Sequence, residues 1–214
     1  FNVGNVAGAG LGLQVVFGIP VWVGAVISAA IAIGIFLLKE AGRAMDRFAL
    51  ALGLVLVALT WYVAAVSGAP LGEAIEKTFI PTNIDIFAIV TIVGGTVGGY
   101  ITFAGAHRLV DAGVHGPEAV GEVTKSALWA MGIASLMRIV LFLAALGVVY
   151  RGLALDPANP PASVFRHVTG EVGYKIFGVV MWSAAITSVV GAAYTSVSFL
   201  RGLLLWGGIV AVVA

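Results

Sequence analysis

Charged residues are scarce in this sequence, and cysteine is missing altogether. Only 10% of the 214 residues are charged, whereas 61% are hydrophobic and the mean hydropathy is +1.11. A soluble domain typically has about 25% charged residues, and one of this size could not hide so much apolar surface from water. The composition therefore indicates an integral membrane protein, for which lipid replaces water as the solvent.

The missing residue types also exclude several classes of function. Without cysteine there are no disulfides and no thiolate metal sites. The net charge of +1 gives no electrostatic reason to expect a nucleic-acid partner. The sequence contains no His-Glu-x-x-His, no Gly-x-Ser-x-Gly and no phosphate-binding Gly-x-x-x-x-Gly-Lys motif. We therefore expect a protein that is not an enzyme and needs no cofactor.

Long uncharged runs mark the membrane spans, since about 20 apolar residues suffice for one crossing. Residues 1–38 carry no charge and are divided by a Phe-Gly-Ile-Pro turn at 17–20. The runs are longer than the roughly 10 residues of a barrel strand and do not alternate in polarity, so we predict an all-α polytopic bundle. The predicted spans are 1–17, 20–38, 48–66, 86–106, 127–150 and 174–200, with 202–214 beginning a seventh.

Lysine and arginine are distributed unevenly between the two sides of this bundle. Six of them lie in the loops 39–47 and 107–126 or at Arg201, against four on the other side. The positive-inside rule places the first group in the cytoplasm. On the opposite side, the loop 151–173 is expected to hold a short helix at 163–168. Because both ends of the sequence lie inside apolar stretches, we expect a fragment of a longer protein, with one transmembrane domain over 1–214.

Glycine is frequent, at 29 residues, and it recurs at helical spacing. Gly4, Gly8 and Gly12 lie on one face of the first span. In lipid, faces of small residues let helix backbones approach closely, so we predict tight packing of the first and sixth spans. The small residues of the sixth span are Thr187, Ser188, Gly191, Ala192, Thr195 and Ser196.

The fourth span is unusual, because four of six consecutive residues at its centre are glycine. Each glycine costs a continuous helix up to about 1 kcal/mol against alanine. Unwound backbone at membrane depth is tolerated where it lines a cavity, and transporters use such breaks to hold a substrate or ion. We therefore predict a broken helix and a substrate-binding site formed by Gly94, Gly95, Thr96, Gly98, Gly99, Tyr100 and Thr102.

Two other interpretations of this segment are open. The glycines could serve a close helix crossing without any break. The letters Thr-Val-Gly-Gly-Tyr at 96–100 are superficially similar to a potassium-channel filter, which sits in a re-entrant loop. Apolar residues continue on both sides far enough to span the membrane, which argues against a channel.

Four polar residues elsewhere are candidates for a polar pathway. Arg138 lies near the middle of the fifth span, where a charge must face the bundle interior or water and find a partner. Asn2 and Asn5 lie at helical spacing on the first span, and His107, at the end of the fourth, titrates near neutral pH. Structural roles are open for each, since buried amides commonly bridge helices and interfacial histidines anchor helix ends.

Two motifs resemble the NRAMP family of divalent metal transporters. The stretch NVAGAGLGLQVVFGIPVWVG at 5–24 is similar to the family's third and fourth helices. Gly94-Gly95-Thr96-Val97 occupies the place of the "G-A-T-V" that opens the family's broken sixth helix. The resemblance covers helices three to eight and part of nine of an uncharacterised bacterial branch. It implies a LeuT-type inverted-repeat bundle that acts as a secondary transporter in the cell membrane.

The sequence departs from the family pattern at the positions that bear on ion selectivity and coupling. Family members continue with Met-Pro-His where this chain has Gly98, Gly99 and Tyr100, so the soft thioether ligand is gone. The acidic pair of the family's third helix falls on Asn2 and Asn5, whose amides cannot carry a proton by titration. We expect transport of a divalent cation, either Mg²⁺ with part of its water shell or Mn²⁺. A small organic solute or amino acid is the alternative, and a channel or a non-transporting membrane protein is a third hypothesis.

Overall fold

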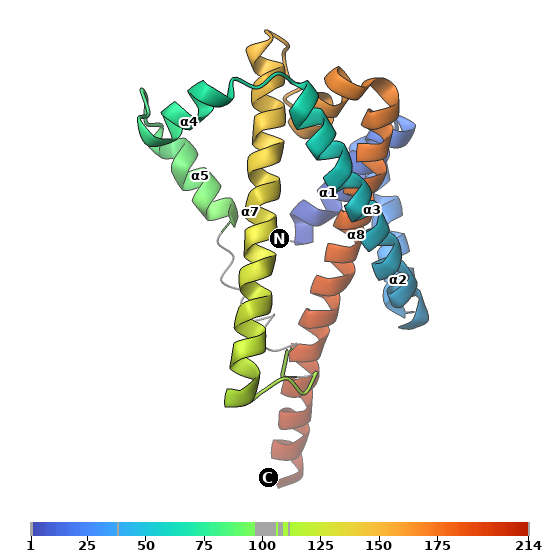
Figure 1. Ribbon diagram of the computed structural model, residues 1–214. Coiled ribbons are helices and arrows are strands. Elements are labelled where there is room, and N and C mark those ends of the chain that lie inside the picture. The colour runs from blue at the N-terminus through green and yellow to red at the C-terminus, as the bar shows by residue number, and fades with distance from the viewer. Residues whose placement is uncertain (1, 38, 97–105, 107–108, 111, 214) are drawn as a thin grey trace. The chain divides into compact units, whose positions relative to one another are not determined.

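The computed structural model describes residues 2–37, 39–96, 106, 109–110 and 112–213, and within them every regular secondary-structure element is a helix (Figure 1). They form two compact units, one of Phe1–Ala69 with Val140–Ala214 and one of Pro70–Ile139. The all-α class predicted from the sequence is confirmed for this part of the chain.

Each helix belongs to one of the two units, except α7, which contributes residues to both. The first unit holds α1 (Asn2–Phe17), α2 (Val21–Leu37), α3 (Lys39–Val66), α8 (Pro160–Val213) and the end of α7 (Val120–Tyr150). The second unit holds α4 (Leu71–Phe79), α5 (Ile86–Thr96), a short 3-10 turn η1 (Pro117–Ala119) and the start of α7.

A tight turn joins α1 to α2. Gly18 ends α1 with a φ of +71°, a conformation that glycine adopts without steric cost. Its N–H donates to the carbonyl of Gln14 at 2.7 Å, and the carbonyl of Pro20 accepts from the N–H of Gly24 at 3.1 Å. The two helices are bent by 113° relative to each other. The turn predicted at 17–20 is therefore confirmed.

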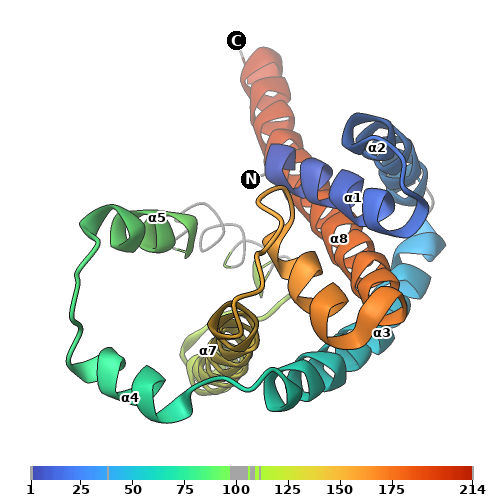
Figure 2. The same cartoon turned by 90° about the horizontal axis from the view of Figure 1, so that it is seen from above.

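Small residues set the distance between α1 and α8, which lie side by side in Figure 2. A Cβ on Gly12 would lie 2.7 Å from the backbone nitrogen of Trp182 and 2.9 Å from the carbonyl oxygen of Gly178. A Cβ on Gly8, one turn earlier, would lie 3.7 Å from the Cβ of Ala185. The two helices meet backbone to backbone, as the glycine face predicted.

A second close approach, on another face of α1, was not predicted. A Cβ on Gly24 of α2 would lie 2.9 Å from the carbonyl oxygen and 3.1 Å from the Cα of Gly10. Gly10 lies outside the four-residue repeat of Gly4, Gly8 and Gly12 from which the packing was predicted. Glycines thus fit α1 against two neighbouring helices at once.

The core of the first unit forms where α8 changes direction. Gly170, with φ +67° and ψ −160°, interrupts α8 and separates its first turns from the long remainder. Phe165 and Phe177 stack on each other across this break, with ring centroids 4.5 Å apart. They pack with Val63 of α3 and Val148 of α7. The short helix expected at 163–168 is confirmed as the opening segment of α8.

The second unit lacks a buried core, because none of its described residues is buried. Asp85 caps α5, since its Oδ1 accepts from the N–H of Ala88 at 3.0 Å and its carbonyl from the N–H of Ile89 at 3.1 Å. A unit with such exposed apolar residues needs lipid or further protein to cover it.

Two described stretches, Pro117–Tyr150 and Pro160–Ala193, are each long and apolar enough to cross a membrane. The bent pair of Val3–Phe17 with Val21–Ile35 also qualifies when its members are taken together, as does Leu50–Val66 with Leu71–Phe79. Within the described backbone, α8 continues from 171 to 213 without the break expected near 201. The division into seven spans and the inverted repeat stay predictions.

Candidate functional site

The first three residues of the predicted binding segment form the last turn of α5. Gly94, Gly95 and Thr96 are helical, so the backbone is still regular at the first pair of glycines. A Cβ on Gly94 would meet no heavy atom of the described structure within 4 Å. Within the described part of its own unit, Gly94 therefore has no close helix crossing, and both explanations of the glycine cluster stay open.

The remainder of the segment lies outside the described residues. This applies to Gly98, Gly99, Tyr100 and Thr102, and also to His107. The broken helix and the substrate-binding site accordingly stay predictions.

Arg138 lies deep within α7, on a side of the helix that is exposed. It is 13 residues from Lys125 and 13 residues from Arg151, and no other charge lies between those two. At 1.5 Å per residue, it is about 20 Å along the helix from either one. Arg138 forms no ion pair with any residue whose side chain the structure describes. If α7 crosses the membrane as predicted, a charge near its middle requires a partner.

The predicted polar residues are divided between the two units. Asn5 is half-buried on α1 in the first unit, whereas Gly94 and Arg138 belong to the second. Asn2 is the first described residue of α1 and lies one helical turn from Asn5. Among the described residues, no three His, Asp or Glu side chains gather closely enough to hold a metal ion.

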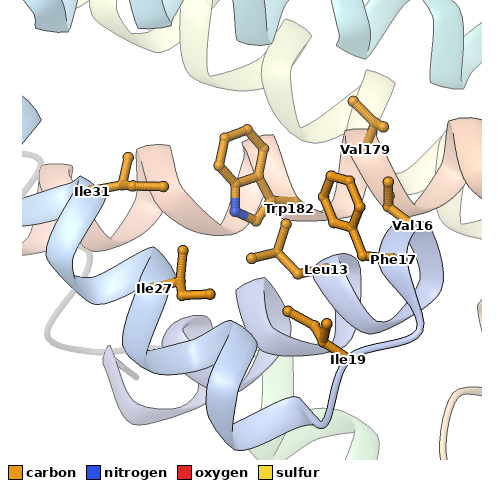
Figure 3. Close-up of a pocket in the computed structure, with 8 residues that line it drawn as sticks. All are labelled: Leu13, Val16, Phe17, Ile19, Ile27, Ile31, Val179 and Trp182. Carbon is orange, nitrogen blue, oxygen red and sulfur yellow. The ribbon is translucent and has the colours of Figure 1, made fainter.

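A cavity of about 520 Å³ that was not predicted from the sequence lies between α1, α2 and α8 (Figure 3). Its lining is apolar and comprises Leu13, Val16, Phe17, Ile19, Ile27, Ile31, Val179 and Trp182. The one polar atom of these side chains, Nε1 of Trp182, already donates to Oγ of Ser28 at 3.1 Å. The cavity offers no ligand to a cation and shares no residue with the predicted substrate-binding segment.

Only the spacing of the lining residues along the sequence could have indicated this cavity. Leu13 and Phe17 are four residues apart on α1, and Ile27 and Ile31 are four residues apart on α2. Such pairs share one helix face, but uniformly apolar membrane helices carry many of them. Only the 113° bend between the two helices determines which pairs face each other.

Comparisons with known proteins agree on the class of this chain. The family model "Natural resistance-associated macrophage protein-like" matches residues 1–210. An uncharacterized membrane protein of Bacillus subtilis, YcsG, is 64% identical over 201 residues, which cover 94% of this chain and 50% of that protein. An uncharacterized membrane protein of Haemophilus influenzae is 60% identical over 203 residues, 95% of this chain and 51% of its own length. No solved structure matches.

The chain thus spans about half the length of the curated relatives it matches. Both relatives are named as membrane proteins, in agreement with the apolar helices described above. The family match extends over nearly every residue of the sequence. The chain belongs to the natural resistance-associated macrophage protein family, NRAMP, and is a membrane protein.

Proposed function

We propose that the complete protein is a secondary transporter that carries a divalent cation across the cell membrane. The observation that supports this proposal most is the family match over residues 1–210. The cluster of glycines at 94–99 adds a local reason, since a broken span provides free peptide carbonyls for an ion. The substrate would be held by this segment, close to the end of α5.

The ligands that the segment offers favour a hard cation over a soft one. Gly98 and Gly99 present only peptide groups, and the nearby side chains Thr96, Tyr100 and Thr102 present hydroxyl oxygens. Mg²⁺ prefers oxygen ligands and keeps several of its waters, whereas a thioether favours softer transition metals. We therefore propose Mg²⁺ as the first substrate to test and expect Mn²⁺ to be carried less well.

The expected route of proton coupling is altered as well. Asn2 and Asn5 are neutral at every physiological pH and cannot carry a proton as an acidic pair would. All ten acidic residues of the sequence fall outside the predicted spans. His107 is the one histidine of this chain directly beside the end of a predicted span. Because an imidazole can both bind and release a proton in the physiological pH range, we propose it as the alternative proton carrier.

A small organic acid or amino acid is the second candidate substrate, and one observation favours it. Apart from Lys175 at the very start of the sixth span, Arg138 is the only charged residue within the predicted spans, and it is positive. A guanidinium pairs well with a carboxylate, whereas it repels a cation. If Arg138 faces the transport pathway, it would hold the carboxylate of such a solute.

Uptake into liposomes that contain the purified full-length protein tests both candidates. We expect uptake of Mg²⁺ to exceed that of Mn²⁺, with no uptake of amino acids. Uptake of an amino acid or organic acid in place of both ions would establish the second candidate. Absence of uptake for every member of this panel, by protein that is folded, would contradict the proposed function.

The same liposomes test Arg138 through the variant Arg138→Gln. If the second candidate is the substrate, we expect uptake to fall at least about tenfold, equivalent to about 1.4 kcal/mol, because glutamine cannot form an ion pair with the carboxylate of the solute. The matched control is Arg151→Gln, which makes the same change in the exposed turn after α7. Wild-type uptake and folding of Arg138→Gln would remove this residue from the pathway.

A further inference from the structure

The helix α4 (Leu71–Phe79) separates its residues sharply into an apolar and a polar face. Leu71, Ile75 and Phe79 recur every four residues and share one side of the helix. Glu73, Glu76 and Lys77 lie on the other side, where Nζ of Lys77 is 3.4 Å from Oε1 of Glu76. Because its three charged residues interrupt every uncharged run, α4 was not predicted from the hydropathy of the sequence.

The apolar face of α4 has no protein partner among the described residues. The exposed fractions are 56% for Leu71, 63% for Ile75 and 79% for Phe79, and α4 contains no buried residue. Three large side chains on one side of a nine-residue helix are an unfavourable surface to leave in water.

The chain itself holds α4 close to the membrane boundary. Four residues, 67–70, connect α4 to α3, and an extended segment of that length reaches at most about 14 Å. α3 carries the uncharged run 48–66, whose 19 residues suit a membrane crossing. On the other side, six residues connect α4 to the apolar helix α5. A segment tethered at both ends to apolar helices cannot move far from the bilayer surface.

We propose that α4 lies flat in the membrane–water interface, with Leu71, Ile75 and Phe79 inserted among the lipids. An amphipathic helix of this kind buries its apolar side below the headgroups and keeps its charged side in water. Two acidic residues against one basic residue give α4 a net charge of −1, so its partner is a zwitterionic rather than an anionic lipid surface. The helix anchors the connection between α3 and α5 at the bilayer surface, whatever the substrate of the transporter is.

The absence of cysteine makes a direct test practical. Single cysteines are introduced at 71, 73, 75, 76, 77 and 79 of the full-length protein, with any cysteine outside residues 1–214 replaced, and each is labelled with a nitroxide. In zwitterionic liposomes, collision rates are measured with oxygen, which concentrates in lipid, and with a water-soluble nickel chelate. Labels at Thr82 and Leu54, both at exposed positions, serve as references for the connecting loop and for a predicted span.

We expect labels at 71, 75 and 79 to collide preferentially with oxygen and labels at 73, 76 and 77 with the nickel chelate. Low collision rates with both reagents at 71, 75 and 79 would mean that protein covers this face, and the proposal would be wrong. Equal access of the chelate to both faces would place α4 in water and would also overturn it. Neither result depends on transport activity, so failure here and failure of the proposed function are distinguishable.

Discussion

Replacing Gly12 with leucine is expected to leave little or no folded protein. A Cβ at this position would lie 2.7 Å and 2.9 Å from backbone atoms of Trp182 and Gly178 on α8. Backbone atoms cannot swing aside as the end of a flexible side chain can. Overpacking costs about 1–3 kcal/mol in an ordinary core, and a leucine between two helix backbones should exceed that range. The measurement is the yield of monodisperse protein in detergent, together with its melting temperature.

The matched control is Gly4→Leu, which makes the same change two turns earlier on α1. A Cβ on Gly4 would meet no heavy atom of the described structure within 4 Å, and leucine favours a helix over glycine by up to about 1 kcal/mol. Gly8→Leu should fall between the two, because its nearest neighbour is 3.7 Å away. Equal yields for Gly12→Leu and Gly4→Leu would contradict the packing of α1 on α8.

The double variant Gly98→Leu with Tyr100→Ala is expected to abolish uptake while leaving the protein folded. Leucine would occupy space that the proposed site gives to the substrate, and alanine would remove one of the three hydroxyl groups of the segment. The loss of two interactions of about 1.4 kcal/mol each corresponds to about a hundredfold decrease in affinity. The initial rate of uptake into liposomes, for the substrate that the wild-type protein carries, is the measurement.

A second double variant controls for added bulk and lost tyrosine away from the site. Gly34→Leu with Tyr150→Ala alters an α2 position with no atom within 4 Å of a Cβ and an exposed residue at the end of α7. We expect it to transport normally. If the Gly98 and Tyr100 variant also transported at the wild-type rate, the substrate would not be held at this segment.

Local chain chemistry explains which parts of the fold could be predicted. The turn at 17–20 follows from a glycine with positive φ and a proline, both of which act within a few residues. The helical character of the apolar runs follows from their length. In contrast, α7 begins at Val120 and not at 127, because charged residues end a membrane span without ending a helix.

The contacts between elements were harder to predict, for physical reasons. Gly10 contacts Gly24 because the 113° bend after α1 turns α2 back toward α1. The spacing of the glycines along the sequence does not reveal the angle of this bend. α4 combines charged and apolar residues within nine positions, so an amphipathic pattern, and not hydropathy, was the signal to use. Of the predicted site, the structure describes only Gly94–Thr96, as the last turn of α5, and the site itself stays a prediction.

The central claim is that the helix of the fourth span is broken at the glycines and that the free peptide groups there bind the substrate. A density map of the complete protein in lipid, at a resolution that shows peptide carbonyls, tests it most directly. We expect helical hydrogen bonding to stop after Thr96 and the carbonyls near Gly98 and Gly99 to face a cavity. Unbroken bonding from Val93 through Ile101, packed against neighbouring helices without a cavity, would contradict the account.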